Sequence, residues 1–288
     1  MVAAVLEVVP DNANARNMKT HIFAPPGTNL SPRLERNRRG RDLVVGDVHG
    51  HFGTLRRALA ELEVGEHDRV FSLGDLVDRG PDSWAAKDWI GGTDPSARFD
   101  LVLRGNHEQM MLTALVEGPR RRLQRWTNDA WSLWMMNGGD WWRATSREQS
   151  AHAWIEALGA LPFCARVETG HGPVGLVHAA PVHGRWHDLE EWVNGDEDLS
   201  HLTRTRALWS RVRHGLVQRE IGETGNEHLG PVEGVRCVVT GHTPVREPTW
   251  HENVLGIDTG VHITERGYGR LTIARIEGKE IETLSFNR

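Results

Sequence analysis

Residues 43–50 read Leu-Val-Val-Gly-Asp-Val-His-Gly, a short apolar run that stops at a glycine and is followed by polar side chains. A run of this length, bounded by turn residues, is typical of a buried strand. The same design recurs at residues 70–75, where Val-Phe-Ser-Leu runs into Gly-Asp, and at residues 101–107, where Leu-Val-Leu runs into Arg-Gly-Asn-His. The three stretches therefore predict three strands, each ending in polar residues.

Helical patterns occupy the intervals between these strands. Apolar residues recur at helical spacing over residues 52–62, and residues 83–90 and 108–117 also favour helix. Strands that alternate with helices at intervals of about thirty residues predict a βαβαβ core, and hence an α/β fold with parallel strands. Four later runs are predicted to be strands as well: 174–177, 235–240, 254–257 and 271–276.

The composition limits the class of protein. Of the 288 residues, 39% are apolar and 25% charged, so the chain can bury a full core without disulfides. Its net charge of −5 argues against a nucleic-acid partner, because such proteins usually present a basic surface. No apolar run reaches the ~18 residues of a membrane span, and residues 1–10 lack a secretory pattern, so we expect no membrane partner. Cys164 and Cys237 fit no metal-binding or redox spacing, which predicts reduced thiols in a cytoplasmic protein.

We expect two parts, an irregular N-terminal arm at residues 1–40 and a single domain at residues 41–288. Within the domain, residues 119–160 form a predicted helical insertion rich in tryptophan, whose indoles we expect to pack together rather than stack on a ligand. Residues 184–232 form a variable insertion, and its acidic run is predicted to be a solvated loop. The tryptophans of the helical insertion are Trp126, Trp131, Trp134, Trp141, Trp142 and Trp154.

Acidic and imidazole side chains gather where the three strands end. Asp47 and His49 follow the first strand, Asp75 follows the second, and Asn106 and His107 follow the third. Neighbouring parallel strands lie ~5 Å apart, so these groups are expected to converge on one spot. Clustered carboxylates repel one another unless a cation neutralises them, so the pattern predicts a metal site.

The kinds of donor narrow the metal. Carboxylates, imidazoles and one amide, with no thiolate, suit Mn, Fe, Co or Zn. Two further histidines, His178 and His242, follow later predicted strands. The donors are too many for one site that keeps a reactive water, and two ions about 3.5–4 Å apart that share a carboxylate fit them better.

Together these motifs resemble the phosphoprotein phosphatase family of the calcineurin-like metallophosphoesterases, in particular its bacteriophage lambda-type and bacterial serine/threonine phosphatases. The resemblance extends over roughly residues 42–276. It implies a β-sandwich of mixed sheets flanked by helices around the βαβαβ core. The motifs that carry it lie at 46–50, 74–80, 104–111, 137–139, 208–211, 241–244 and 257–260, with His178 between them.

The resemblance also implies a cofactor and its ligands. Two divalent metal ions per chain are expected, with Mn foremost and Fe, Zn, Co or Ni as alternatives. A hydroxide that bridges both ions would attack the phosphorus directly. Asp47, His49 and Asp75 would hold the first ion, and Asp75 would bridge to the second, held also by Asn106, His178 and His242.

Further roles follow from the same resemblance. His107 would protonate the leaving oxygen as the general acid, and Asp78 would orient its imidazole. Arg79, Arg211 and Arg104 would bind the substrate phosphate. The implied activity is hydrolysis of phosphoserine and phosphothreonine in a phosphorylated protein or peptide, with dual specificity toward phosphotyrosine as an extension.

Other activities remain open at this point. Symmetrical diadenosine tetraphosphate hydrolases share the fold branch, but they favour Asp after the Asn-His pair, where this chain has Glu108. A non-catalytic sensor or scaffold would not need every proposed ligand. A nuclease on the same fold would need a basic groove that the sequence does not show.

Overall fold

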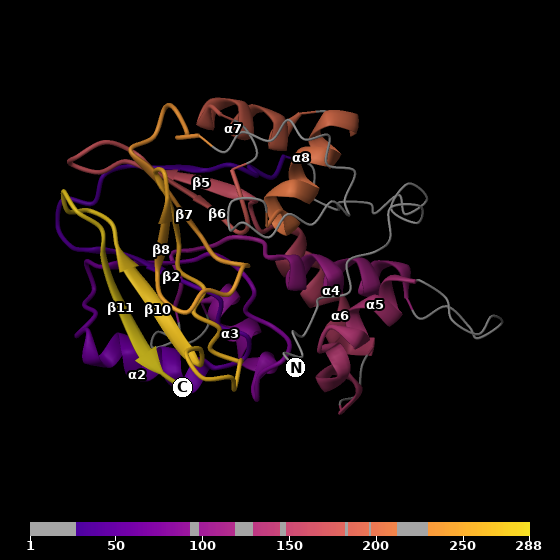
Figure 1. Ribbon diagram of the computed structural model, residues 1–288. Helices are drawn as coiled ribbons and strands as arrows, with labels where there is room; N and C mark the ends of the chain where they lie inside the picture. The colour runs from indigo at the N-terminus through magenta and orange to yellow at the C-terminus, as the bar shows by residue number, and fades with distance from the viewer. Residues whose placement is uncertain are drawn as a thin grey trace.

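The computed structural model describes residues 27–92, 98–118, 129–144, 148–181, 184–195, 197–211 and 230–288. Two mixed β-sheets pack face to face within these residues, and helices cover their outer sides (Figure 1). The expected α/β sandwich of mixed sheets is therefore confirmed.

The first sheet contains the predicted core. Its strand order is β11-β10-β2-β3-β4, in which β2, β3 and β4 run parallel and β10 is antiparallel to β2. The strands are β2 (Asp42–Val45), β3 (Arg69–Ser72), β4 (Leu101–Val102), β10 (Arg270–Arg275) and β11 (Glu282–Asn287). The connections are α2 (Phe52–Glu61) between β2 and β3, and the 3-10 helix η1 (Ser83–Ala85) with α3 (Ala86–Gly91) between β3 and β4.

The second sheet has the order β1-β5-β6-β7-β9-β8. In it, β6, β7 and β9 run parallel, while β5 and β8 are antiparallel to their neighbours β6 and β9. Its strands are β1 (Arg33–Leu34), β5 (Cys164–Val167), β6 (Val174–Val177), β7 (Cys237–Thr240), β8 (Thr249–His251) and β9 (Val254–Gly256).

Both faces of the central strands are buried. In β2, Val44 faces the layer between the two sheets, whereas Leu43 and Val45 face the helices, because successive side chains point to opposite faces. This double burial explains why the strand is a continuous apolar run rather than an alternating one. Figure 1 shows α7 (Trp186–Asn194) and α8 (Glu197–Trp209) over the second sheet, and α2 beside the first.

The described part of residues 119–160 is helical, as expected. It consists of α5 (Ala130–Met136), η2 (Gly139–Ala144) and α6 (Glu148–Gly159), which gather beside α4 (Asn106–Glu117) at one end of the molecule (Figure 1). Trp134, Trp142 and Trp154 are at most 1% exposed and belong to one apolar cluster. The expected packing of indoles is confirmed, while Trp126 lies outside the described residues.

The prediction of a solvated loop for the acidic stretch is wrong where the structure describes it. Residues 186–194 form α7 instead, because Trp186, Leu189 and Val193 bury one face of that helix against the second sheet. The acidic Glu190 is itself buried and accepts a hydrogen bond from Trp186 Nε1 at 3.1 Å. Asp196 lies outside the described residues.

The expected arm is ordered in its described part, residues 27–40. Arg33 and Leu34 pair in parallel with Arg166 and Val167 at the edge of the second sheet. Residues 1–26 lie outside the described residues.

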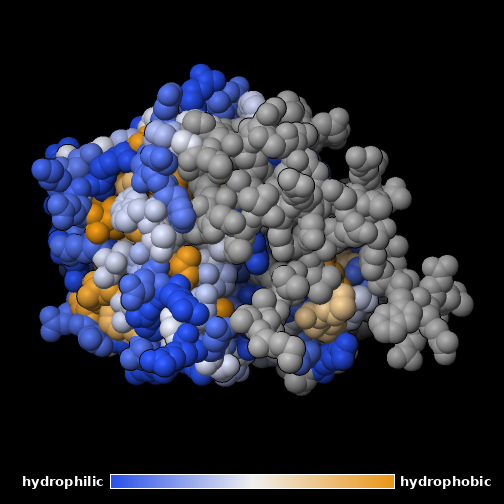
Figure 2. All heavy atoms as spheres, in the orientation of Figure 1, coloured by the Kyte–Doolittle hydropathy of each residue, from blue (hydrophilic) through white to orange (hydrophobic). Residues whose placement is uncertain are grey.

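Cys164 and Cys237 are both free thiols and both buried. No described helix is long and apolar enough to cross a membrane. On the face shown in Figure 2, hydrophilic side chains predominate over the described surface and apolar ones form small separate patches.

One ion pair, between Arg41 just before β2 and Asp68 just before β3, offers a test of the packing at this end of the first sheet. Asp68 accepts hydrogen bonds from the backbone N–H of Arg41 at 2.7 Å, from its guanidinium at 2.7 Å and from Gly65 N at 2.9 Å. Arg41 lowers the pKa of Asp68 from 3.8 to about 2. We expect Asp68→Asn to lower the free energy of unfolding by about 1–2 kcal/mol at pH 7, a modest value because the Arg41 side chain is 29% exposed to screening solvent.

The pH dependence has a defined sign. A carboxylate whose pKa is depressed stabilises the fold above its unfolded pKa, and the contribution is lost as the pH falls toward the folded value. Chemical denaturation should therefore show the difference between wild type and Asp68→Asn shrinking between pH 4 and pH 2. Glu61→Gln, at an exposed carboxylate of α2, is the control and should change stability by less than about 0.5 kcal/mol. An equal loss of unfolding free energy in Asp68→Asn and Glu61→Gln would contradict the stabilising role of the Asp68–Arg41 pair.

Candidate active site

Both sheets bring polar side chains to one place. Asp47 and Asp75 follow β2 and β3, Asn106 begins α4, and His178 and His242 follow β6 and β7. Asn106 Oδ1 joins the two sheets, because it lies 2.9 Å from His178 Nε2 and 2.8 Å from His242 Nδ1. The carboxyl ends of parallel strands from both sheets thus converge, as expected for sites in α/β folds.

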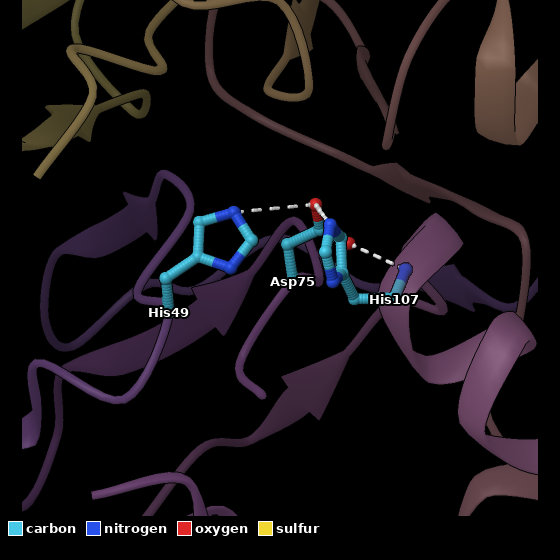
Figure 3. A group of neighbouring side chains, drawn as sticks. All are labelled: His49, Asp75 and His107. Carbon is cyan, nitrogen blue, oxygen red and sulfur yellow. Dashed lines mark hydrogen bonds and ion pairs between the residues drawn. The ribbon is translucent and has the colours of Figure 1, made fainter. Parts of the chain in front are cut away.

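Two overlapping groups of side chains could each hold a metal ion. The first is His49, Asp75 and His107, drawn in Figure 3, and the second is Asp75, His178 and His242. In each group the candidate ligand atoms lie within 4.8 Å of one another, and all five residues are buried. The shared member is Asp75, the residue expected to bridge.

The two oxygens of Asp75 face different groups. Oδ2 lies 3.6 Å from His49 Nε2 and 4.0 Å from His107 Nε2, whereas Oδ1 lies 3.4 Å from His178 Nε2. Oδ1 also accepts a hydrogen bond from the backbone N–H of His107 at 3.0 Å. A carboxylate placed in this way can contribute one oxygen to each of two cations.

Backbone carbonyls orient two of the imidazoles. His49 Nδ1 lies 2.9 Å from Val77 O, and His178 Nδ1 lies 2.9 Å from Leu73 O. Because a carbonyl only accepts, each Nδ1 carries the proton and each Nε2 presents its lone pair to the cluster. His178 Nε2 and Asn106 Oδ1 are then two lone-pair donors 2.9 Å apart, which a cation between them would satisfy.

The electrostatics of the cluster also fit a bound cation. Burial raises the pKa of Asp47 well above its ordinary value, and the nearby charges of Asp258 and Asp75 raise it further. Burial lowers the pKa of His49, with smaller contributions from His262 and Arg79, so its imidazole is in the neutral form that binds metals. Crowded buried carboxylates beside neutral imidazoles form a donor set that divalent ions suit.

Asp47 occupies a place different from that of the other expected ligands. It is outside both three-residue groups, while His107 is inside the first one. The Asp47 carboxylate accepts from the backbone N–H of His242 at 3.1 and 3.2 Å, and it is close enough to Asp75 to feel its charge. A Cβ at Gly241 would clash with Asp47 Oδ1, so glycine is needed for this approach.

The loop that presents Asp75 is held by Glu108. The Glu108 carboxylate accepts hydrogen bonds from the backbone N–H groups of Asp75, Leu76 and Gly105 at 2.8, 2.8 and 2.9 Å. Burial and the charge of Asp75 raise the pKa of Glu108 to about 7. Positive φ angles at Asp75 (50°) and Asp78 (71°) show that the loop is strained, and Glu108 stabilises it. Glu108 therefore positions this loop through its hydrogen bonds to three backbone N–H groups.

His107 and Asp78 form a buried pair at the edge of the cluster. His107 Nδ1 donates to Asp78 Oδ2 at 2.7 Å, and both side chains are 0% exposed. The contact leaves His107 Nε2 directed at the side of Asp75, as Figure 3 shows. The arrangement can orient a proton on Nε2 toward whatever is bound at the cluster.

Two of the three expected phosphate ligands flank the cluster. Arg79 Nη1 lies 3.3 Å from His49 Nε2, and Arg211 Nε donates to His242 Nε2 at 3.3 Å. Both side chains are partly exposed and so can meet a substrate.

Arg104 has a different environment, which corrects its expected role. It is 0% exposed, donates to Gln109 Oε1 at 3.0 Å and to Gly159 O at 2.7 Å, and its guanidinium lies 4.7 Å from the centre of the Phe163 ring. Burial lowers its pKa to about 9. A fully buried guanidinium committed to these contacts packs α4 against the end of α6 and against Phe163, just before β5, rather than binding a phosphate that arrives from solvent.

Sequence reasoning missed His262. Its ring centroid lies 4.4 Å from that of His49, and its Nε2 lies 3.3 Å from Arg79 Nη1. The signal for His262 in the sequence is weak. It follows the motif Ile257-Asp258-Thr259-Gly260, which contributes to the family resemblance but has no site role assigned to it.

Known proteins share this architecture and much of its sequence. The family model of the calcineurin-like phosphoesterases matches residues 41–246. The serine/threonine-protein phosphatase 1 of Salmonella typhimurium is 33% identical over 244 residues, which are 81% of this chain and 91% of that protein. A symmetrical bis(5'-nucleosyl)-tetraphosphatase of an Acidovorax species is 30% identical over 207 residues, which are 70% of this chain and 64% of that protein.

The fold has a solved counterpart as well. A protein serine/threonine phosphatase of Saccharomyces cerevisiae superposes with a TM-score of 0.59 at 14% identity, covering 90% of this chain and 84% of the yeast chain. At that identity the likeness concerns the fold alone. The convergent strand ends, the two candidate metal groups and the family match over residues 41–246 lead to one conclusion: this chain belongs to the calcineurin-like phosphoesterases.

Proposed function

We propose that the protein is a metal-dependent serine/threonine protein phosphatase. The observation that carries the proposal is the buried His107–Asp78 pair beside a cluster flanked by two arginines, Arg79 and Arg211. The similarity to a serine/threonine phosphatase of Salmonella over 81% of the chain supports it. The partner would be a phosphorylated protein or peptide, in the cytoplasm, where buried thiols such as Cys164 and Cys237 stay reduced.

The cofactor of the proposal is a pair of divalent ions, with Mn as the first choice. Such ions, when bound, lower the pKa of a coordinated water and neutralise charge on the phosphoryl oxygens. Asp75 would hold both ions. The other ligands would be Asp47 and His49 for one ion, and Asn106, His178 and His242 for the second.

The remaining residues would handle the substrate. Arg79 and Arg211 would bind the phosphate oxygens and fix the ester in line, because guanidinium groups form paired hydrogen bonds with phosphate. His107 would deliver its Nε2 proton to the seryl or threonyl oxygen as the phosphorus–oxygen bond breaks. Asp78 would accept from Nδ1 throughout and stabilise the charged imidazolium before that transfer.

Metal titration tests this proposal. Protein stripped of metal should release no phosphate from a phosphoserine peptide, and activity should return with Mn and saturate at two ions per chain. Activity that survives stripping, or saturation at one ion per chain, would contradict a two-ion phosphatase.

A symmetrical dinucleotide tetraphosphatase is the second candidate. The 30% identity to the Acidovorax enzyme over 70% of the chain favours it. The metal cluster would serve a phosphoanhydride as well. That reaction releases a nucleotide phosphate, which leaves as a stable anion and depends less on a general acid than a seryl oxygen does. The buried His107–Asp78 pair therefore supports the phosphoester reaction.

Arg211 gives a prediction about substrate binding. We expect Arg211→Ala to raise KM for a phosphoserine peptide and to lower kcat, because a phosphate contact kept in the transition state contributes to both. A loss of about 10- to 100-fold in kcat/KM is expected from steady-state kinetics. Arg206→Ala, earlier in the same segment at the end of α8, is the comparison and should leave KM unchanged. An unchanged KM in Arg211→Ala would show that Arg211 does not bind the substrate phosphate.

A further inference from the structure

Three donors surround the carboxylate of Asp78. Besides the contact from His107, Trp134 Nε1 donates to Oδ1 at 3.0 Å and to Oδ2 at 3.1 Å, and Trp141 Nε1 donates to Oδ1 at 2.6 Å. The backbone N–H of Asp78 donates to Ser83 Oγ at 2.8 Å. The tryptophan-rich insertion, expected only to pack, therefore also contacts a residue of the proposed reaction.

The turn after α5 brings both indoles to this carboxylate. Gly138 has a φ of 108°, and a Cβ there would lie 2.8 Å from the backbone nitrogen of Arg79. A Cβ at Gly139 would lie 2.6 Å from Trp134 Nε1. Neither position has room for a side chain, so the two glycines of the Asn137-Gly138-Gly139 motif let α5 and η2 close on the loop that carries Arg79.

The chemistry of these donors selects one state of Asp78. An indole N–H can only donate, and an ionised carboxylate can only accept, so two indoles and one imidazole N–H match the ionised form. Asp78 is 0% exposed, so these protein groups take the place of water around it. Donors on both oxygens fix the plane of the carboxylate, with Oδ2 directed at His107 Nδ1.

The fixed plane of the Asp78 carboxylate also fixes the direction of His107 Nε2. A carboxylate held in this plane keeps the His107 imidazole in one rotamer, with Nε2 toward the cluster, 4.0 Å from Asp75 Oδ2. Without the indole donors, the carboxylate could rotate away and the imidazole would lose its fixed direction.

We propose that Trp134 and Trp141 are positioning residues of the reaction, which act through Asp78 to aim the proton of His107 at the leaving oxygen. The inference deepens the proposed function and rests on the role of His107 as general acid. Neither indole need touch the substrate.

Leaving groups separate this role from plain packing. A seryl oxygen leaves poorly and needs a proton, whereas 4-nitrophenolate leaves well without one. A residue that aims the proton should therefore matter for a phosphoserine peptide and hardly matter for 4-nitrophenyl phosphate. A residue that only supports the fold should affect both substrates alike.

The experiment compares single variants of the full chain loaded with Mn. Trp141→Phe keeps an aromatic ring at a partly exposed position but removes the N–H donor. Trp154→Phe is the matched control, because Trp154 is fully buried, its ring centroid lies 6.1 Å from that of Trp141, and its Nε1 has no hydrogen-bond acceptor among the described residues. A benzothienylalanine at position 141, which has the shape of tryptophan without the N–H, separates the lost donor from the lost volume.

We expect Trp141→Phe and the benzothienylalanine variant to lower kcat on the phosphoserine peptide about 10- to 100-fold and kcat on 4-nitrophenyl phosphate less than about threefold. Trp154→Phe should change the ratio of the two kcat values by less than about twofold. Trp134→Phe should show the same selective loss of kcat. Its circular dichroism spectrum, compared with that of the wild type, checks that the buried substitution leaves the fold intact.

His107→Asn distinguishes the two ways in which the account can fail. If His107→Asn shows no leaving-group selectivity, the proposed acid is wrong and the positioning role falls with it. If His107→Asn is selective while the benzothienylalanine variant is not, the acid stands and the role of the indoles is overturned. Equal losses on both substrates in the position-141 variants would likewise overturn it.

Discussion

Replacing Asp75 by Asn is expected to remove the paired metal site and to lower kcat/KM by about 10³-fold or more. Asp75 belongs to both candidate metal groups, and its two oxygens face opposite sides of the cluster. An amide keeps the oxygen that accepts from His107 N but loses the charge and the second oxygen donor. The loss should therefore appear as fewer than two ions per chain by elemental analysis, together with the loss of phosphatase activity.

The stability of the metal-free protein supplies a second, independent reading. The charge of Asp75 raises the pKa of both Asp47 and Glu108, which means that these carboxylates repel one another when no cation is present. Metal-free Asp75→Asn should thus unfold at the same temperature as metal-free wild type or higher, whereas Mn should stabilise only the wild type.

Asp82→Asn is the matched control for this change. Asp82 follows in the same loop, is exposed, and accepts from the backbone N–H of Ala85 at 3.3 Å, which Asn also does. It should keep two ions and full activity. Two ions per chain in Asp75→Asn would contradict the bridging role.

The second large effect is expected from His107→Asn, which should lower kcat on a phosphoserine peptide by roughly 10²–10⁴-fold. The imidazole is aimed by Asp78 at 2.7 Å, and asparagine has no group that can deliver a proton in its place. Both ions should remain bound, because the proposed ligand set does not include His107.

The metal content decides what His107 does. His107 Nε2 lies in the same group as His49 and Asp75, so a role as metal ligand is a real alternative. Elemental analysis that finds two ions in His107→Asn supports the acid, and loss of an ion shows a ligand instead. His187→Asn, at a histidine of α7, gives the background for an imidazole removed elsewhere.

The core of the fold was predictable because its pattern is local. Strands β2, β3 and β6 are short apolar runs buried on both faces, and the turn residues that end them are visible in the sequence. The polar residues that follow these strands and β7, such as Asp47, His178 and His242, converge because parallel strands end at one edge. The local pattern alone predicts parallel strands, and the mixed sheets were predicted only from the family resemblance.

The errors arose where tertiary contacts decide. The acidic stretch forms α7 because Trp186 and Leu189 pack against the second sheet. The acidic residues between them made the apolar face of this helix difficult to recognise in the sequence. Arg104 stands in a phosphatase motif, yet burial over Phe163 sets its role. The contacts of Trp134 and Trp141 with Asp78 join residues more than fifty positions apart, which no spacing rule connects.

The ratio of two specificity constants tests the central claim most directly. Mn-loaded protein should hydrolyse a phosphoserine peptide with a kcat/KM well above its value for diadenosine tetraphosphate, by about tenfold or more. That result is the one predicted for a serine/threonine protein phosphatase with His107 as its acid. A ratio reversed in favour of the dinucleotide would contradict the account and make the protein a tetraphosphatase built on the same cluster.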